Sequence, residues 1–463
     1  MGDDADVDAI TFGTDGWRAT LDVFTEPRVR MVGQAVATYL DETGQDEPVA
    51  VGYDARETSR GFAEELARTL AGNGFDVLLS ETDCPTPVVG WTVRERGLSG
   101  ALMVTASHNP PNYNGVKFVP DEGAPALPED TDRLEDLLAE PDPVEEDAWG
   151  TITEEDLVEP YLEHSLEYVD TDLSGLTVAY DAMHGSGREA TPDLLERAGS
   201  EVVELRCSLD PEFGGTPPEP EAERLEDLIE TVQAGEADLG IANDGDADRI
   251  AVVTPNEGFL DPSLQYAVLY DYLLEERSGP AVRTVSTSSI VDKVARGHGE
   301  EIVETAVGFK WVAQAMAEHD ALMGGEESGG FGLTDHLRNK DGVLIALLAA
   351  AAEAEQSFDD RIAAIHDEHG HVHQDRISVS CPDERKQPVL DELDGALPET
   401  VAGAEVDLVN TVDGFKITFV DDNWLLIRPS GTEPKLRVYA EADSVERVEE
   451  LLEAGRELVE PLV

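Results

Sequence analysis

Three aspartates at alternate positions form the densest group of candidate metal ligands in the chain. Asp244, Asp246 and Asp248 lie between two apolar runs in DLGIANDGDADRIAVV, residues 238–253. Carboxylate oxygens are the ligands that a hard divalent cation such as Mg²⁺ prefers. The alternative is chance, because the same spacing recurs in polar runs of this acidic chain, for example over residues 4–8. The framing by apolar strands favours a metal loop at the edge of a sheet.

A serine at the end of another apolar run is the second candidate. Residues 101–105 are apolar or β-branched and predict a buried strand, which the sequence SHNPP, residues 107–111, must end. We expect Asn114-Gly115 to turn the chain back. Ser107 then lies at the carboxyl end of a core strand, where open α/β sheets place their ligands. The alternative is a serine that only bonds its own backbone.

A tight turn between two strands is a candidate anion site. It lies within WLLIRPSGTEPKLRV, residues 424–438, and carries Arg428, Ser430, Gly431, Thr432 and Lys435. Backbone N–H groups, hydroxyls and a guanidinium around such a turn suit a phosphate. An ordinary hairpin with solvated charges is the alternative, which the scarcity of basic residues disfavours.

Three further places carry polar groups that indicate a function less strongly. Glu326 and Ser328 lie in the glycine-rich run GGEESGGFG, residues 324–332, and suit sugar hydroxyls, although an acidic surface loop has the same composition. Lys310 is one of only seven lysines, and its alternative is a helix-surface residue with a solvated head. Arg18 follows a Gly-Thr-Asp-Gly turn in this base-poor chain.

The elements that position these residues alternate between strand and helix over most of the chain, which predicts layered α/β units. A helix is predicted over 154–168, and from about residue 370 the pattern changes to strands without long helices between them, followed by a last helix over 444–458. The prediction is three α/β units and a smaller α+β domain, with bounds 1–155, 156–256, 257–369 and 370–463.

Composition limits the class of protein. The chain has 463 residues, 41% of them hydrophobic, and 32 Lys+Arg against 100 Asp+Glu give a net charge of −68. Such a charge repels nucleic acid and anionic membrane, so neither is an expected partner. Acid spread along the whole chain predicts a surface adapted to molar salt, hence a salt-loving source. Three scattered cysteines, no signal sequence and no long apolar run predict a soluble cytoplasmic protein.

Taken in order, the motifs resemble those of one family. TASHNPPNYNGVKF, NDGDADR, GGEESGG and RPSGTEP, with FGTDGWRA at the front, closely resemble the α-D-phosphohexomutases over essentially the whole chain. The resemblance implies three related α/β domains and a fourth α+β domain, similar to the TATA-box-binding-protein fold, around a central cleft. That architecture agrees with the alternation described above.

The resemblance also implies a mechanism. Ser107 carries a phosphoryl group, and one Mg²⁺ per chain is held by the phosphoserine and the three aspartates. The phosphoryl group passes to a hexose phosphate, giving a bound 1,6-bisphosphate that reorients and returns its other phosphate to Ser107. The groups implied around the transferred phosphoryl are Arg18, His108, Lys117 and Arg249. Lys117 or a neighbour is the implied general acid/base.

The remaining implied residues bind the substrate. Glu326 and Ser328 hold sugar hydroxyls, and the non-reacting phosphate is gripped by Arg428, Ser430, Gly431 and Thr432. The context Gly308-Phe309-Lys310 is similar to the glucose branch of the family, which implies that Gly308 and Lys310 contact substrate. Gly330 stands where the dual mannose/glucose enzymes usually have histidine.

The expected reaction is therefore interconversion of glucose 1-phosphate and glucose 6-phosphate, with glucose 1,6-bisphosphate as intermediate and activator. Mannose and glucosamine phosphates are the alternative substrates. A Mg²⁺-dependent sugar phosphatase and a non-catalytic sugar-phosphate sensor are the competing classes. The sequence does not indicate an oligomeric state.

Overall fold

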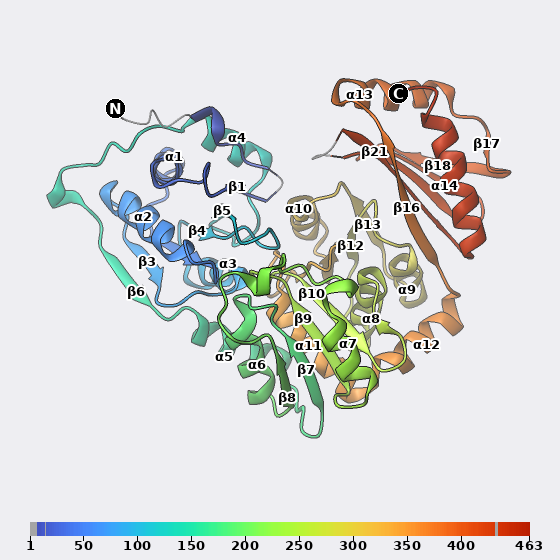
Figure 1. The fold of residues 1–463 in the computed structure, drawn as a ribbon, viewed down its shortest axis with the longest axis horizontal. Coiled ribbons are helices and arrows are strands. Elements are labelled where there is room, and N and C mark those ends of the chain that lie inside the picture. Colours follow the sequence, from blue (N-terminus) through green and yellow to red (C-terminus); the bar gives the residue numbers. More distant parts are fainter. Residues whose placement is uncertain (1–6, 14, 431–433) are drawn as a thin grey trace.

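The computed structural model describes residues 7–13, 15–430 and 434–463. Within these residues the strands form four sheets, one after another along the chain (Figure 1). The first α/β unit comprises β1 (Trp17–Thr20), α1 (Glu26–Thr43), β2 (Val49–Tyr53), α2 (Ser59–Gly72), β3 (Val77–Ser80), α3 (Thr86–Arg96), β4 (Gly100–Val104), β5 (Tyr113–Pro120), α4 (Pro128–Asp136) and β6 (Ile152–Glu155).

The second and third units follow directly. The second comprises α5 (Val158–Val169), β7 (Thr177–Asp181), α6 (Gly187–Arg197), β8 (Glu201–Leu205), α7 (Glu226–Gln233), β9 (Leu239–Asn243), β10 (Ile250–Thr254) and β11 (Gly258–Phe259). The third comprises α8 (Pro262–Leu274), β12 (Ala281–Thr284), α9 (Ile290–His298), β13 (Ile302–Thr305), α10 (Phe309–His319), β14 (Met323–Gly325), β15 (Phe331–Leu333), α11 (Gly342–Glu355) and α12 (Phe358–His369).

The three sheets repeat one topology. In each, the first parallel strand lies between the second and the third, and an antiparallel strand adds to the third. The spatial orders are β5-β4-β2-β3, β10-β9-β7-β8 and β15-β14-β12-β13. The loop between the third parallel strand and its antiparallel neighbour is therefore the equivalent loop in every unit.

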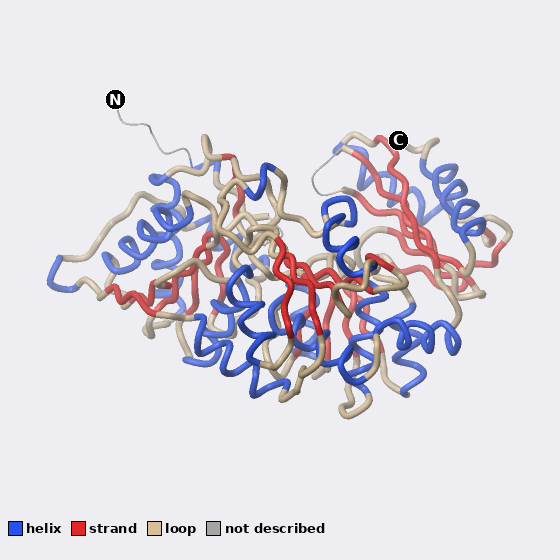
Figure 2. The backbone as a smooth tube through the Cα atoms, turned by 60° about the horizontal axis from the view of Figure 1, so that its bottom comes forward, coloured by secondary structure: helices blue, strands red, loops and turns tan. Residues whose placement is uncertain are grey.

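One helix, α11, packs the second and third units together through their apolar surfaces. The sequence of α11, GVLIALLAAAAEAE, is apolar on all sides, as expected of a helix without a solvent face. It is buried from Gly342 to Ala352 and contacts α5, α6 and α8. A single hydrophobic cluster accordingly runs through all three units, and Figure 2 shows helices packed around the sheets. Among the described residues, no helix has both the length and the apolar character needed to cross a membrane.

The C-terminal unit is a separate antiparallel sheet with two helices. Its elements are β16 (His373–Ser380), α13 (Asp383–Ala396), β17 (Thr400–Val401), β18 (Ala404–Asn410), β19 (Phe415–Phe419), β20 (Trp424–Pro429), β21 (Lys435–Ala442) and α14 (Val445–Val459). It has its own hydrophobic cluster, and in Figure 1 it stands at the opposite end from the first unit. The predicted class, three α/β domains and a C-terminal α+β domain, is confirmed.

Several predicted elements were wrong in detail. The long helix α13 interrupts the C-terminal strands, although a helix-disfavouring proline, Pro388, lies within it. The helix predicted over 154–168 begins only at Val158, because residues 152–155 pair with β3 as edge strand β6. Asn114-Gly115 is no turn: both residues lie in β5, and the chain reverses earlier, after Ser107.

A close backbone contact between the first unit's α3 and the turn after β5 yields a stability prediction. Gly123 has φ +74°, and a Cβ there would lie 2.3 Å from the Gly90 carbonyl oxygen. Gly44, at the end of α1, has φ +73° and no atom within 4 Å of its Cβ position. We expect Gly123→Ala to lower the free energy of unfolding by roughly 2–4 kcal/mol and Gly44→Ala by about 1 kcal/mol, measured by urea unfolding in molar KCl. Equal losses would contradict the contact.

Candidate active site

Three equivalent loops, one from each α/β unit, meet at the candidate site. Ser107 lies in the β4–β5 loop, the aspartates in the β9–β10 loop, and Glu326 in the β14–β15 loop. The first two loops touch where Ser107 Oγ donates to Asp244 Oδ2 at 2.7 Å, and the last two where Ile250 N donates to Gly329 O at 2.9 Å. The repeated topology thus brings together residues far apart in the sequence.

Ser107 is held in an unusual backbone conformation. Its φ of +48° is rare for a residue with a side chain, and such strain is often found at functional sites. Its amide donates to Thr105 Oγ1 at 2.8 Å, and the residue is fully buried. The aspartate loop between β9 and β10 packs directly against it, since a Cβ on Gly245 would lie 2.5 Å from the Ser107 carbonyl oxygen.

A buried arginine that was not predicted as a site residue holds the serine loop. The Arg56 guanidinium donates to Asp54 Oδ2 at 3.0 Å and to four loop carbonyls at 2.7–3.2 Å, those of Ser107, Asn109, Pro110 and Tyr113. Asp54 in turn accepts from Ser59 and Thr105. A signal existed in the sequence, since Asp54-Ala55-Arg56 ends a fully apolar strand, but its long-range partners did not follow from spacing.

The aspartate group fits a divalent cation. One oxygen from each of Asp244, Asp246 and Asp248 can be chosen so that all lie within 4.8 Å of one another, and all three residues are buried. Oδ1 of Asp246 and Oδ1 of Asp248 are buried without a hydrogen-bond partner among the described residues. Buried carboxylate oxygens without partners are costly unless a cation binds them. The donor set, all oxygen and all anionic, suits Mg²⁺.

Two lysines from different units neutralise this group. Lys117 Nζ lies 2.9 Å from both Asp246 and Asp248, and 3.0 Å from Asp15. Lys340 Nζ lies 2.7 Å from Asp248. Burial disfavours a charged lysine, but the three carboxylates hold the pKa of Lys117 well above its ordinary value. Lys117 therefore remains protonated.

Two other groups of the site, Asp244 and His108, have pKa values shifted toward the neutral form. Burial, with the neighbouring Asp246 and Asp248, raises the pKa of Asp244 well above its ordinary value, because a third negative charge is resisted. Burial lowers the pKa of His108 to about 2, with Arg249 and Arg18 adding to the effect. His108 is therefore neutral, and its Nδ1 lies 3.3 Å from Ser107 Oγ.

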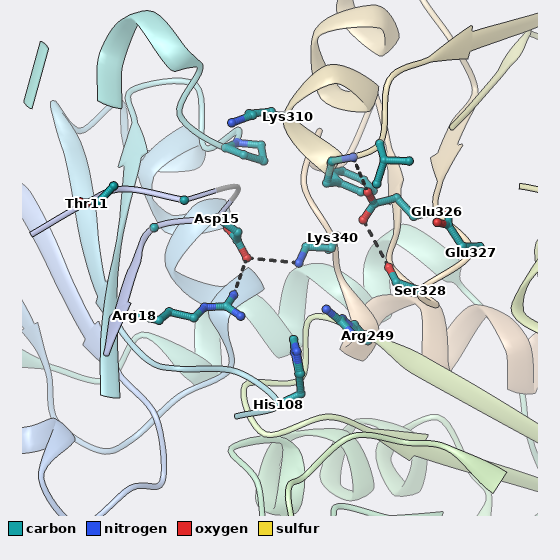
Figure 3. A pocket seen from close by; sticks show the side chains of 16 residues that line it. Thr11, Asp15, Arg18, His108, Arg249, Lys310, Glu326, Glu327, Ser328 and Lys340 are labelled. Atoms are coloured by element: carbon teal, nitrogen blue, oxygen red, sulfur yellow. Dashed lines mark hydrogen bonds and ion pairs between the residues drawn. The ribbon is translucent and has the colours of Figure 1, made fainter. Parts of the chain in front are cut away.

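A pocket of about 410 Å³ opens beside these loops. Of the predicted residues it is lined by Arg18, His108, Arg249, Gly308, Lys310, Glu326 and Ser328. Figure 3 shows Arg18 and His108 on one side facing Arg249, Glu326 and Ser328 on the other. Ser107 and Lys117 are buried next to the pocket and do not line it.

Three charged residues of the lining were not predicted as site residues: Asp15, Glu327 and Lys340. Asp15 Oδ2 lies 3.0 Å from Arg18 Nη2 and 3.4 Å from Lys340 Nζ, so it joins the first and third units. Glu327 accepts from the Thr284 and Ser286 hydroxyls at 2.7 and 2.6 Å. The rarity of lysine in this chain was the signal that could have identified Lys340.

Glu326 is arranged to accept hydrogen bonds. It is 8% exposed, its Oε1 accepts from Gly308 N at 3.0 Å, and its Oε2 accepts from Ser328 Oγ at 3.3 Å. Burial raises its pKa to about 7. A carboxyl that titrates near neutrality at the wall of a pocket can hold a polar ligand in a pH-dependent way.

Of the predicted phosphate turn, the described residues Arg428 and Ser430 are not part of this pocket lining. Arg428 Nε donates to Asp413 Oδ2 at 2.7 Å, and Ser430 is buried with its amide bonded to the Lys435 carbonyl at 2.9 Å. Gly431 and Thr432 lie outside the described residues.

The match to known proteins covers all four units. Models of the phosphoglucomutase/phosphomannomutase family match residues 9–145 as alpha/beta/alpha domain I, 159–258 as domain II, 261–369 as domain III and 377–458 as the C-terminal domain. The chain belongs to the phosphoglucomutase/phosphomannomutase family.

Individual relatives of this phosphoglucomutase/phosphomannomutase family member span its whole length. A Methanopyrus kandleri protein assigned as a phosphoglucosamine mutase is 35% identical over 95% of each chain. A Thermococcus kodakarensis phosphoglucomutase/phosphomannomutase is 33% identical over 97% of this chain and 98% of the relative. The crystal structure of a Thermus thermophilus protein assigned as a phosphomannomutase has a TM-score of 0.83 at 32% identity, over 98% of this chain and 99% of that chain. The protein is thus a phosphohexomutase, an isomerase that transfers phosphate within its substrate.

The aspartate group generates a prediction about Mg²⁺. Adding Mg²⁺ to the EDTA-treated protein in molar KCl should raise the melting temperature, because only the folded chain assembles the three carboxylates. Asp246→Asn and Asp248→Asn should weaken the apparent affinity at least about tenfold, since each removes one ligand charge. The control is Glu223→Gln, an exposed carboxylate of the same unit. Unchanged titrations of both aspartate variants would place the cation elsewhere.

Proposed function

We propose that this phosphohexomutase interconverts glucose 1-phosphate and glucose 6-phosphate through phosphorylated Ser107 and a bound 1,6-bisphosphate. The observation that carries the proposal is the 2.7 Å contact of Ser107 Oγ with Asp244, at the metal-competent carboxylates and beside a pocket lined with basic side chains. A phosphatase that uses a positioned water, or a sensor, needs no nucleophile in that position.

The reaction requires a balanced exchange at one oxygen. In the first half, the P–Oγ bond of phosphoserine breaks and a P–O bond forms to the free hydroxyl of the hexose phosphate. The net proton movement is from that hydroxyl to Ser107 Oγ. We propose that protonated Lys117 donates to Oγ as the P–Oγ bond breaks and then takes the proton of the hydroxyl, with neutral His108 beside Ser107. After the bound bisphosphate has reoriented, the same steps run in reverse with its other phosphate.

Catalysis of this kind depends on positioning and on charge. Bound Mg²⁺ supplies positive charge that stabilises the phosphoryl group as it moves between oxygens. Arg18, Lys340 and Arg249 line the pocket and would bind the equatorial phosphoryl oxygens. The hydrogen bonds from Arg56 fix the Ser107 carbonyl, and so the direction in which Oγ points. We propose Arg428 and the turn at 430–432 for the phosphate that does not react.

In this proposal, substrate choice depends on the glycine-rich loop over residues 324–332, the sugar loop. Glu326 and Ser328 offer a carboxylate and a hydroxyl, which can meet hexose hydroxyls in both orientations of the bisphosphate. Gly330 in place of a histidine, together with Lys310 after Gly308-Phe309, supports glucose. Glucosamine phosphate is the second candidate, favoured by the name of the Methanopyrus kandleri relative and by the carboxylates of the pocket, which suit an amino group. Mannose phosphate is the third.

The acidic surface supports the proposal that the protein comes from a salt-loving organism similar to a haloarchaeon. It would then work in a cytoplasm of molar salt. The net charge of −68 is tolerable where screening acts over about 3 Å. Assays are therefore designed in molar KCl.

The first test is a mutase assay with Mg²⁺ and a trace of the matching bisphosphate. Glucose, glucosamine and mannose 1-phosphates are supplied separately, and 6-phosphate and free phosphate are followed. We expect 6-phosphate to form fastest from glucose 1-phosphate and to fall at least about a thousandfold in Ser107→Ala, because the variant has no phosphoryl acceptor. Free phosphate as the main product would favour the phosphatase, and binding without turnover would favour the sensor.

The ionisation of Glu326 yields a pH prediction. Its pKa of about 7 means that it is mostly ionised at pH 8 and mostly protonated at pH 6. If the ionised form accepts sugar hydroxyls, KM for the hexose phosphate should rise about tenfold from pH 8 to pH 6. Glu326→Gln should have a higher KM at pH 8 and lack this rise. The substrate phosphate titrates equally in both assays, so parallel pH profiles would exclude Glu326 as the titrating group.

A further inference from the structure

The C-terminal sheet contacts the third unit through a buried polar interface. Lys416 on β19 donates to the Val285 carbonyl at 2.8 Å and pairs with Glu304 at the end of β13. Its ammonium lies 4.5 Å from the centroid of the Trp424 ring. Asn410 reaches the same Glu304 from the end of β18. The adjoining ends of β18 and β19 are thereby held against β13 and Val285.

One carboxylate oxygen in that turn bonds both units at once. Asp413 Oδ2 accepts from the backbone N–H of Val307, in the third unit, at 2.9 Å. The same oxygen accepts from Arg428 Nε, within the C-terminal unit, at 2.7 Å. A charge-assisted hydrogen bond through Nε restricts the guanidinium, so Asp413 positions Arg428 relative to the third unit.

The contact continues into the sugar side of the pocket. Val307 and Gly308 both line the pocket, and Gly308 N donates to Glu326 Oε1 at 3.0 Å. Glu326 Oε2 accepts from Ser328 Oγ at 3.3 Å. Two consecutive peptide N–H groups therefore bind two carboxylates. The N–H of Val307 binds Asp413, which holds Arg428, and the N–H of Gly308 binds Glu326 in the β14–β15 loop.

We propose that Asp413 is a positioning residue that couples phosphate binding at Arg428 to sugar binding at Glu326 and Ser328. The proposal rests on the proposed function of these residues. A phosphate that binds the Nη groups of Arg428 leaves Nε on Asp413, and so holds Asp413 in place on Val307. The peptide that carries the Gly308 N–H is then held as well, and Glu326 with it. The phosphate site at Arg428 and the sugar site at Glu326 and Ser328 therefore tighten and release together. A bisphosphate that must reorient in the pocket requires such a joint release.

A double-mutant cycle tests this coupling. Ser328→Ala perturbs the sugar side and Arg428→Lys the phosphate side, and both changes are made alone and together, first with Asp413 intact and then in the Asp413→Asn background. Calorimetry measures the Kd of glucose 6-phosphate in molar KCl, and steady-state assays measure KM and kcat. With Asp413 intact we expect the double variant to depart from the product of the single effects by about fivefold or more. In the Asp413→Asn background the departure should fall below about twofold.

The control variant is Asp421→Asn, which removes the same charge from the exposed turn between β19 and β20. Asp421→Asn should leave the coupling at its original size. Asp413→Ala should remove the coupling as Asp413→Asn does, while circular dichroism and the melting temperature show that both remain folded. Coupling that persists in Asp413→Asn, or an Asp413 effect confined to the melting temperature, would overturn the proposal.

Failure of the proposed function gives a different result. If the protein binds glucose 6-phosphate without turnover, the mutase assignment fails, but the Kd cycle still reports the coupling. If glucose, glucosamine and mannose 6-phosphates all fail to bind, there is no phosphate site to couple, and the role of Asp413 is refuted as well.

Discussion

Three carboxylates buried within 4.8 Å of one another are the constraint on which the rest of the structure depends. Like charges so close in a site shielded from water repel strongly, and they persist only where cations compensate them. The aspartates come from the second unit, Lys117 from the first and Lys340 from the third. The charge balance of the centre therefore requires all three units in place, and it specifies their relative positions together with the shared apolar core.

The same balance explains how an acidic protein can hold an anionic substrate. With 100 acidic residues, the surface as a whole repels phosphate. The pocket reverses this locally, because several of the few basic side chains line it, among them Arg18, Arg249, Lys310 and Lys340. Fields within a cleft of low dielectric constant are focused and little screened, so the pocket stays attractive in salt that screens the surface.

The sequence predicted well whatever is encoded locally. The strand before Ser107, the aspartate loop framed by two strands and the division into three α/β units and an α+β unit all depend on short-range patterns, and the structure has them. The sequence was less informative where pairing with a distant segment decides which element forms. Residues 152–155 form a strand because β3 offers an edge, and α13 forms despite Pro388 because it packs on the C-terminal sheet. Arg56, Asp15 and Lys340 have partners more than 50 residues away in at least one contact, which no spacing rule reveals.

The three α/β units share one strand order, and each contributes to the site the loop between its third parallel strand and the antiparallel strand beside it. Such an arrangement is what successive duplication of one ancestral segment would leave, with one copy supplying the proposed nucleophile, another the proposed metal ligands and the third the proposed contacts to the sugar. Because every loop is anchored in its own sheet, substitutions in one copy need not disturb the other two. On the proposed roles, changes at 326–330 alter sugar preference while the phosphoryl chemistry stays intact, which is how a lineage of such proteins could diversify in substrate and keep one reaction.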